Sequence, residues 1–148
     1  MSIIWQLKRF DELTPHELYA ILQLRNEVFS FEQNCVYQDA DDRDQPSFHF
    51  MGWFNNKLIA YTRIMPPGLA YTEASIGRVV TSPTVRGSGS GRELMIRSMS
   101  ELYKLFGNVP IKIGAQVYLL NFYSSLGFIQ TSDIYLEDGI EHVEMVKS

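Results

Sequence analysis

Residues 86–92 read Arg-Gly-Ser-Gly-Ser-Gly-Arg, which is the composition of an anion-binding loop. The alternate glycines carry no Cβ, so several backbone N–H groups can approach one ligand. An amphipathic helix is predicted over 92–106, where apolar residues recur every three or four positions. The N-terminus of such a helix adds a partial positive charge. The segment therefore predicts a site for a phosphate group.

Two common classes of phosphate-binding loop fit this segment poorly. A P-loop requires a lysine and a hydroxyl residue after its last glycine, whereas the next lysine here is Lys104. A dinucleotide-binding loop requires Gly-x-Gly-x-x-Gly and an acidic residue about 20 positions later. Gly87, Gly89 and Gly91 have a different third spacing, and residues 104–116 contain no Asp or Glu. A nucleotide-binding protein of another class stays open as an alternative.

Two motifs resemble those of the GCN5-related N-acetyltransferases (GNAT). The first is Arg86-x-x-Gly89-x-Gly91, a loop that in this family holds the pyrophosphate of acetyl-coenzyme A (acetyl-CoA). The second is residues 121–128, Asn-Phe-Tyr-Ser-Ser-Leu-Gly-Phe, whose tyrosine lies beside the thioester sulfur in this family. The resemblance implies the GNAT acyltransferase fold and acetyl-CoA (coenzyme A) as the co-substrate.

Further matches resemble the ElaA-type branch of this family. They lie within residues 25–44, 76–79 and 135–142, so the resemblance covers nearly the whole chain. The chain departs from the branch at Val36, where proline is usual, and from the wider family at Gln116, where asparagine is frequent. This branch is poorly defined in function, so the resemblance does not identify the acceptor.

The resemblance also implies which residues bind the cofactor. In this family the strand before the glycine loop pairs with the pantetheine arm, and the second motif reaches the thioester. The cofactor-binding residues implied in this way are Val79, Val80, Thr81, Arg86, Gly87, Ser88, Gly89, Ser90, Gly91, Arg92, Gln116, Asn121 and Tyr123.

Acetyl transfer from a thioester to an amine requires a neutral amine and a stabilised thiolate. An alkylamine has a pKa of ~10.4, so its deprotonation at pH 7 costs about 4.6 kcal/mol, which a general base relieves. The predicted base is Glu73, at the start of the strand before the loop, or Glu32, in the branch signature. Tyr123 is the predicted acid or hydrogen-bond donor toward the sulfur.

Three other residues are weaker candidates for catalysis. Glu137 and His142 flank a hairpin near the end of the sequence, and either can instead be structural. Cys35 could act as a nucleophile in an acyl-enzyme route. No histidine lies close to it in sequence, however, and direct transfer is the usual route in the family.

The composition is typical of one globular domain, predicted over residues 1–148. No apolar run is long enough to span a membrane, and the N-terminal residues do not form a secretory signal. The single cysteine is compatible with a reducing cytoplasm, where we expect the protein. The three histidines are widely separated, so we expect no metal site.

The net charge of −4 is unevenly distributed. Residues 32–44 sum to −4, from five acids and one arginine, whereas residues 78–97 sum to +3, from four arginines and one glutamate. The basic segment suits an anionic cofactor. The acidic segment is interpreted either as a field that attracts a cationic amine or as a solvated loop. Nucleic-acid binding is disfavoured because the net charge is negative and the basic residues gather at one loop.

The order of elements is typical of an α+β sandwich around a mixed central sheet of about six to seven strands. Helices are predicted to begin at Pro15, after the N-cap Thr14, and at Arg92. Hairpin turns are predicted at Asn55-Asn56 and Asp138-Gly139. Strands are predicted over 3–10, 48–54, 57–65, 73–81, 111–117, 128–137 and 140–146. The resemblance adds flanking helices and a splayed pair, 73–81 and 111–117, with the pantetheine arm in the gap.

The predicted function is transfer of an acetyl group from acetyl-CoA to a primary amine, by direct attack in a ternary complex. The acceptor is expected to be a small molecule or a peptide. A homodimer is compatible with this family, in which dimers are common. The alternative within the same fold is a non-catalytic module that binds acyl-CoA and senses its level.

Overall fold

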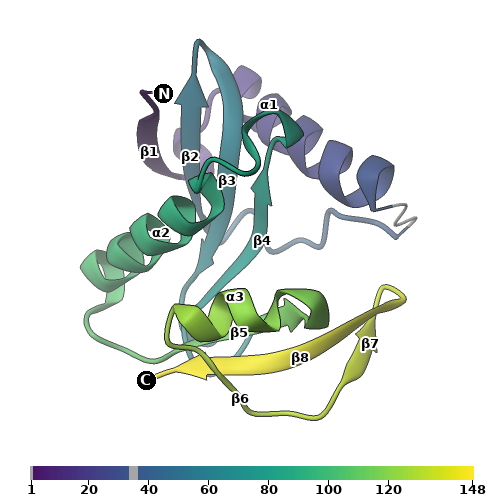
Figure 1. The fold of residues 1–148 in the computed structure, drawn as a ribbon. Coiled ribbons are helices and arrows are strands. Elements are labelled where there is room, and N and C mark those ends of the chain that lie inside the picture. Colours follow the sequence, from purple (N-terminus) through teal and green to yellow (C-terminus); the bar gives the residue numbers. More distant parts are fainter. Residues whose placement is uncertain (1, 34–36) are drawn as a thin grey trace.

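The computed structural model describes residues 2–33 and 37–148, and its strands form two antiparallel sheets. Figure 1 shows the two sheets meeting at an angle, with β4 of the first next to β5 of the second. The first sheet has the order β1 (Ile4–Arg9), β2 (Phe48–Phe54), β3 (Lys57–Met65) and β4 (Ser75–Thr81). In the second, β8 (Ile140–Lys147) pairs with β5 (Ile111–Gln116), and also with β6 (Ile129–Gln130) and β7 (Tyr135–Glu137).

The GNAT fold expected from the motifs is confirmed, with eight described strands where about six to seven were predicted. The splayed pair is present as well. β4 and β5 approach each other at a single parallel bridge, Ala74–Ile111, next to which the Lys112 N–H donates to the Ala74 carbonyl (2.9 Å). Beyond this bridge no other pairing joins the two strands in the described residues.

Both predicted hairpin turns are confirmed. Asn55 (φ 49°) and Asn56 (φ 61°) join β2 to β3, and Asp138 (φ 51°) and Gly139 (φ 75°) join β7 to β8. Positive φ at both central residues is the requirement of a type I′ turn, whose twist matches the flanking strands. Each turn sets the register of its hairpin, and the second one positions part of the candidate site.

The helices begin close to the predicted positions. Thr14 caps α1 (Pro15–Arg25): its hydroxyl accepts from the Glu17 N–H (3.1 Å), and its own N–H donates to the Glu17 carboxylate (2.8 Å). The helix α2 (Ser90–Phe106) follows the glycine loop. The remaining helical segments are the π-helix η2 (Asn26–Glu32), which continues α1, the short helix α3 (Leu120–Ser125), and the 3-10 turns η1 (Phe10–Glu12), η3 (Pro83–Val85) and η4 (Val117–Leu119).

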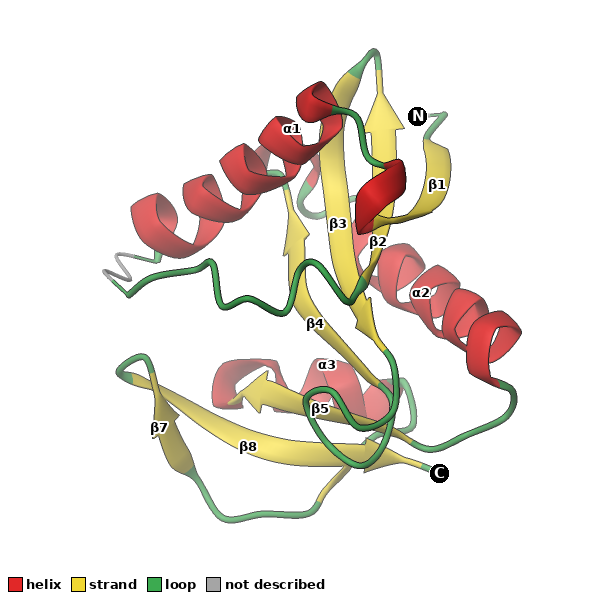
Figure 2. Cartoon of the chain, turned by 180° about the vertical axis from the view of Figure 1, so that it is seen from behind, coloured by secondary structure: helices red, strands yellow, loops and turns green. Residues whose placement is uncertain are grey.

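The helices α1 and α2 cover opposite faces of the first sheet, as Figure 2 shows. Successive side chains of a strand point to opposite faces. Met51 of β2 accordingly packs in a cluster with Ile21 of α1, while the preceding Phe50 packs in a second cluster with Leu94 of α2. The second cluster continues into the other sheet through Met145 of β8. This shared core holds the two sheets together on the side away from α1.

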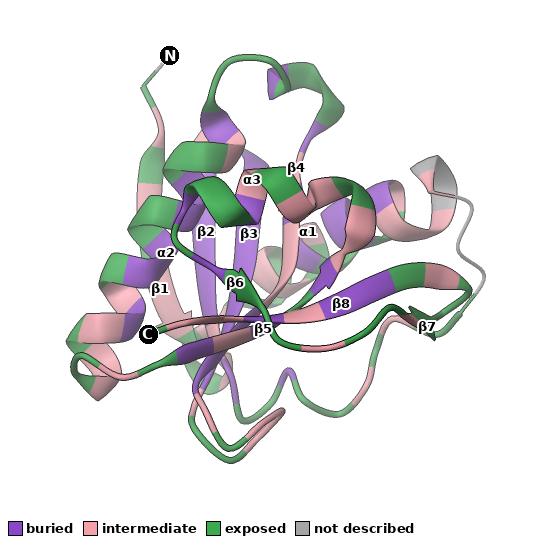
Figure 3. Cartoon of the chain, turned by 60° about the horizontal axis from the view of Figure 1, so that its bottom comes forward, coloured by how far each residue is buried: buried purple, intermediate pink, exposed green. Residues whose placement is uncertain are grey.

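The predicted continuous strand over 128–137 was wrong. It is divided into β6 and β7. Between them the Ser132 hydroxyl, and not a backbone carbonyl, accepts the hydrogen bond from the Glu144 N–H (2.8 Å). Figure 3 shows the result, an exposed outer edge beside the buried middle of β8. The break separates β7 from β6, and among the described residues β7 pairs only with β8.

Candidate active site

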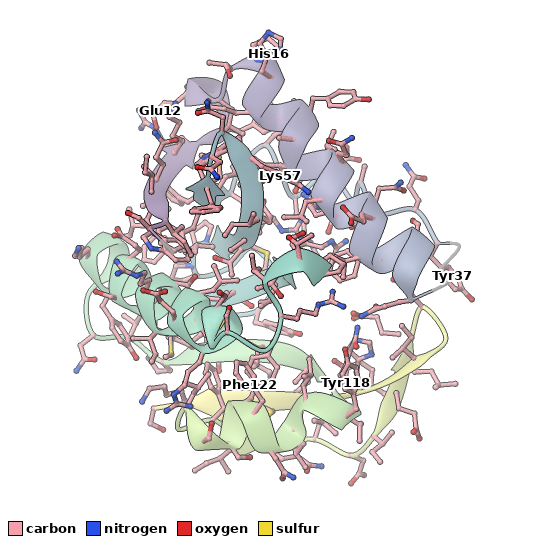
Figure 4. The ribbon with its side chains drawn as sticks, turned by 45° about the horizontal axis from the view of Figure 1, so that its top comes forward. Glu12, His16, Tyr37, Lys57, Tyr118 and Phe122 are labelled. Atoms are coloured by element: carbon pink, nitrogen blue, oxygen red, sulfur yellow. The ribbon has the colours of Figure 1, made fainter. Side chains whose placement is uncertain are left out.

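A cavity of about 470 Å³ lies between the splayed strands β4 and β5. Figure 4 shows Tyr118 and Phe122 on one side of it, and Tyr37 beyond the end of η2 on the other. The cavity is lined by Val28, Phe29, Gln33, Tyr37, Gln38, Asp39, Ile76, Gly77, Arg78, Val79, Val80, Thr81, Arg86, Gly91, Ile113, Gly114, Gln116, Tyr118, Leu119, Phe122, Tyr123, Glu137, Asp138, Ile140 and His142.

A β-bulge in β4 shapes one wall of this cavity. Tyr61 of β3 lies opposite Val80, but Arg63 lies opposite Gly77, so β4 has one residue more than β3 over this stretch. Arg78 in the bulge has φ 50°, a left-handed conformation that is unfavourable for a residue with a side chain. The other edge of β4 faces the cavity and has no partner strand beyond Ala74 in the part of the chain that the structure describes. Its backbone groups are therefore available to a ligand.

The glycine loop leads from β4 into α2, as predicted. Gly87 (φ 82°) and Gly89 (φ 80°) both have left-handed backbone, and Gly89 is the N-cap of α2. A Cβ at either position would contact nothing within 4 Å, so backbone conformation rather than crowding favours glycine there. The Ser88 hydroxyl bonds to that of Ser90 (2.7 Å), which fixes the turn. The loop thus points the first N–H groups of a long helix outward, as an anion site requires.

The predicted cofactor residues divide into two groups. The first group lines the cavity: Val79, Val80, Thr81, Arg86, Gly91, Gln116 and Tyr123. The second group lies outside the lining, mostly in the glycine loop at its end: Gly87, Ser88, Gly89, Ser90, Arg92 and Asn121. Arg92 donates to the Ser125 hydroxyl (3.0 Å) and thereby ties the start of α2 to α3.

Tyr123 is buried, with 6% of its surface exposed, and still lines the cavity. Its ring packs edge-to-face between Phe122 (5.1 Å between centroids) and Phe128 (6.0 Å). Burial, with a smaller contribution from Tyr118, raises the pKa of Tyr123 to about 12. The hydroxyl therefore keeps its proton at neutral pH and can donate a hydrogen bond into the cavity.

Gln116, Gln33 and Tyr118 form a chain of polar contacts at the cavity; neither Gln33 nor Tyr118 was a predicted site residue. The Gln116 amide donates to the Gln33 side-chain oxygen (3.3 Å), and the Gln33 amide donates to the Tyr118 hydroxyl (3.5 Å). These contacts join the end of η2 to the end of β5 across the cavity. Tyr118 lies in η4, two residues after the end of β5, and neither of the two family motifs includes it.

Neither interpretation of the acidic segment holds for three of its four aspartates, whereas Asp42 is exposed, as in a solvated loop. Asp39, Asp41 and Asp44 bind three arginines that come from α1, β3 and β4. Arg25 donates to Asp39 (2.7 Å) and Asp44 (2.8 Å). Arg63 donates to Asp41 (2.7 Å) and Asp44 (2.9 Å), and Arg78 donates to Asp39 (2.7 Å). We call these six residues the arginine–aspartate cluster; its charges cancel.

This cluster is a buried ionic network. Arg25 has no exposed surface and Arg63 has 2%. Burial alone would raise the pKa of Asp41 and of Asp44, but hydrogen bonds from the arginines outweigh it and hold both pKa values below their ordinary range. The network fixes residues 37–44, whose first three side chains line the cavity.

Of the two predicted bases, the structure describes the side chain of Glu73 alone. Glu73 is half-buried ahead of β4 and is not part of the lining. The side chain of Glu32 and the whole of Cys35 lie outside the described residues. Two of the weaker candidates, Glu137 and His142, do line the cavity.

The β7–β8 hairpin brings Glu137 and His142 together. Their side chains lie on one face of the hairpin, with His142 Nε2 3.6 Å from a Glu137 carboxylate oxygen. The other ring nitrogen, Nδ1, lies 2.7 Å from the Ile140 carbonyl oxygen. A carbonyl can only accept, so Nδ1 carries a proton and donates it.

Two other features, a metal site and a membrane-spanning helix, are absent from the described ranges. No three His, Cys, Asp or Glu side chains in residues 2–33 and 37–148 are grouped closely enough to hold a metal ion. Over the same residues no helix combines the length and the apolar character needed to cross a membrane.

Known proteins share both the sequence and the fold. Residues 16–148 match the acetyltransferase (GNAT) domain family. Protein ElaA of Escherichia coli is 42% identical over 98% of this chain and 96% of its own length. A UPF0039 protein of Synechocystis sp. is 39% identical over 99% of this chain and 96% of its own.

Two solved structures are similar over nearly their whole length. The crystal structure of an acyl-CoA N-acyltransferase from Pseudomonas aeruginosa has a TM-score of 0.95 at 40% identity, covering 99% of this chain and 100% of that one. The crystal structure of E. coli ElaA has a TM-score of 0.93, also at 40% identity, with the same coverage. With its splayed strands, glycine loop and ElaA-like sequence, the chain belongs to the GNAT acetyltransferase family.

Proposed function

We propose that this protein is an acetyl-CoA-dependent N-acetyltransferase that acts on a primary amine. One observation carries the proposal: a single cavity joins the open edge of β4, the start of the glycine loop and the hydroxyl-bearing Tyr123. These are the three contacts that an acyl-CoA requires, for its pantetheine amides, its pyrophosphate and its sulfur. Coenzyme binding is a property of this fold, since a GNAT family acetyltransferase from Elizabethkingia anophelis (16% identity, TM-score 0.66) has acetyl-CoA bound.

The bound cofactor would extend along β4. The pyrophosphate would accept hydrogen bonds from the N–H groups of the loop and of the first turn of α2, where the helix dipole also favours negative charge. The pantetheine amides would pair with the cavity-facing edge of β4, much as another strand would. The acetyl carbonyl would then lie near the bulge, where a backbone N–H close to Val80 would stabilise the developing oxyanion.

The reaction is a direct transfer. The acceptor ammonium loses one proton to a base, and the lone pair of the resulting amine forms the new C–N bond. The C–S bond breaks, and its electron pair leaves on the sulfur. The thiolate takes up the second proton that nitrogen loses, so the products are an acetamide, free CoA and one proton released through the base.

Tyr123 would stabilise the leaving thiolate by a hydrogen bond. Its pKa of about 12 lies well above that of an ordinary thiol, ~8.5, so complete transfer of its proton to the sulfur would be unfavourable. Donation of a hydrogen bond has no such cost, and the packed ring holds the hydroxyl in one orientation. We therefore assign Tyr123 the role of donor and not of acid.

The test begins with thermal unfolding in the presence of acetyl-CoA, CoA, ATP or NADH. A ligand at 100 times its Kd adds about 2.7 kcal/mol of stability, which raises the midpoint by several degrees. We expect a shift with acetyl-CoA and CoA only. A shift with ATP or NADH alone would instead support a nucleotide-binding protein of another class.

Turnover separates the enzyme from a sensor of acyl-CoA. With acetyl-CoA and a panel of primary amines, we expect thiol release whose rate depends on the amine; binding without release would favour the sensor. Tyr123→Phe should lower kcat by about 10- to 100-fold, because a hydrogen bond to a charged group contributes about 1.5–3 kcal/mol. Its affinity for CoA should stay unchanged. Normal turnover by Tyr123→Phe would remove this residue from the mechanism.

A further inference from the structure

We propose that His142 is the general base that deprotonates the acceptor amine, and that Glu137 binds the same amine as its ammonium ion. This inference rests on the proposed function and goes beyond it, because it assigns the base and the charge of the acceptor. It replaces the predicted bases Glu32 and Glu73 by a pair that the β7–β8 hairpin holds at the cavity.

The hydrogen bond at Nδ1 determines which nitrogen of His142 can accept a proton. Because Nδ1–H donates to the Ile140 carbonyl at 2.7 Å, the neutral ring has its lone pair on Nε2. The ring has little freedom to turn: it is 94% buried and stacks on Tyr135, with 5.9 Å between the ring centroids. Nε2 is therefore a fixed proton acceptor on the cavity wall.

The distance between His142 and Glu137 suits a hydrogen-bond donor from a ligand that contacts both side chains. The separation of 3.6 Å between Nε2 and the carboxylate oxygen is longer than a normal hydrogen bond. In the neutral state of His142 both atoms are acceptors. An ammonium group has three N–H donors and one positive charge, so it can donate to both atoms at once.

The two side chains of the pair differ in their exposure to solvent. The Glu137 side chain is 52% exposed and that of His142 only 8%, so an acceptor that enters from solvent meets the carboxylate first. Glu137 would attract the cation, and His142, deeper in the wall, would take its proton. The imidazolium formed in this step would then be stabilised by the neighbouring carboxylate until it releases the proton to solvent.

The other groups around His142 do not compete for this role. Burial is the main cause that raises the pKa of two neighbouring tyrosines, Tyr135 of β7 and Tyr71 in the segment before β4. Both therefore stay neutral. Glu144, further along β8, pairs with Lys112 of β5 (3.3 Å). Gln116, opposite His142 on β5, is uncharged. Glu137 is thus the charged group in contact with the ring among the described residues.

The variant that tests the base is His142→Asn. Its amide can still donate to the Ile140 carbonyl, but it cannot take a proton. At pH 7 we expect kcat/KM for alkyl diamines such as cadaverine to fall by about 100-fold or more. The loss should shrink as the pH approaches the amine's own pKa of ~10, because the free amine then needs no base. A merely structural role would give a loss that does not change with pH.

Controls distinguish failure of this inference from failure of the proposed function. The acetyl-CoA-induced thermal shift should be equal in wild type and His142→Asn, and His16→Asn, at an exposed position on α1, should be fully active. Wild-type activity with no loss in His142→Asn would overturn the inference alone. Acetyl-CoA binding without turnover by the wild type on any amine of the panel would overturn the proposed function and this inference with it.

The tautomer of His142 can be measured without an acceptor. Nitrogen NMR of the imidazole, assigned by its absence in His142→Asn, should show the neutral ring protonated at Nδ1. A ring protonated at Nε2 would contradict the proposal. Glu137→Gln should raise KM for an alkyl diamine by about fivefold, as expected for a half-exposed ion pair, and leave KM for a neutral aromatic amine unchanged. Equal effects on both amines would exclude ammonium binding by Glu137.

Discussion

Two groups of charged side chains border the cavity, and their charges are paired to different degrees. In the arginine–aspartate cluster each aspartate binds a guanidinium at 2.7–2.9 Å, and two of the arginines are buried. In the Glu137–His142 pair the atoms lie 3.6 Å apart and the carboxylate is half-exposed. The first group has its partners within the protein and maintains the shape of the site. The second can still accept a hydrogen bond from a ligand.

Two histidines repeat the contrast: His49, which contacts the arginine–aspartate cluster, and His142 of the hairpin pair. His49 uses both ring nitrogens: Nε2–H donates to the Asp44 carbonyl (2.8 Å), so Nδ1 accepts from the Tyr61 hydroxyl (2.6 Å). Burial lowers the pKa of His49, so it stays neutral in the core. His142, which lines the cavity, forms such a bond through Nδ1, and its Nε2 lies 3.6 Å from the Glu137 carboxylate. Burial of a histidine therefore does not by itself decide between a structural and a chemical role.

The largest expected effect comes from breaking the arginine–aspartate cluster. Asp44→Ala should lower the free energy of unfolding by about 3–5 kcal/mol, because Arg25 and Arg63 would lose their shared carboxylate inside the protein. Urea unfolding followed by circular dichroism measures the loss. The control is Asp11→Ala, an exposed acid on η1, with a change within about 0.5 kcal/mol. Equal losses in the two variants would mean that the cluster does not stabilise the fold.

Acid should weaken the arginine–aspartate cluster. The pKa of Asp41 is depressed in the folded state, so the unfolded state binds more protons at acidic pH. The stability that Asp41 contributes is therefore complete above about pH 4, its unfolded pKa, and is lost as the pH falls further. Urea midpoints measured between about pH 5 and pH 2 should fall less steeply in Asp41→Asn than in wild type. The same slope in both proteins would contradict this assignment.

A smaller effect separates the backbone of the bulge from the side chain of Arg78. Arg78→Ala and Arg78→Gly both remove the ion pair with Asp39, but only glycine adopts φ 50° without strain. Arg78→Ala should be less stable than Arg78→Gly by about 1 kcal/mol, measured by urea unfolding. An alanine variant as stable as the glycine variant would show that the bulge relaxes when the ion pair is lost.

The smallest effect is expected in the hairpin pair. Glu137→Gln should change the free energy of unfolding by no more than about 0.5 kcal/mol, because the carboxylate is half-exposed and its contact is long. Thermal and urea unfolding of the same preparations used for kinetics provide the value. A loss of several kcal/mol would place Glu137 with the structural ion pairs and end the contrast between the two groups.

The parts of the fold that depend on local signals could be predicted from the sequence. The Asn55-Asn56 turn, the Thr14 cap and the glycine loop each follow from the conformational preferences of a few adjacent residues. The break between β6 and β7 could not, because it depends on a hydroxyl, at Ser132, that bonds to a residue twelve positions away. The alternation of apolar and polar residues that predicts a strand does not indicate this contact.

The candidate site could be predicted where a motif of adjacent residues forms it, and not where side chains from distant segments meet. The resemblance indicated β4, the loop and Tyr123 together. For the acids of residues 39–44 the sequence indicated either a solvated loop or a field that attracts amines. It did not indicate their arginine partners, which lie up to 39 positions away in the chain. The conformation of Arg78 also depends on a register shift against β3, which a single strand does not reveal. For the same reason the Glu137–His142 pair was only one of several candidates.

Asp39 connects two elements of the fold, α1 and β4. One carboxylate oxygen accepts from Arg25 at the end of α1, and the other accepts from Arg78 in the bulge of β4, each at 2.7 Å. Asp39 itself lines the cavity. In the proposed binding mode, an acceptor that displaces residues 37–39 would therefore also displace β4, the strand that would face the cofactor. Coupling between two binding sites is reciprocal. If acceptor binding changes the affinity for the cofactor through Asp39, cofactor binding changes the affinity for the acceptor by the same factor.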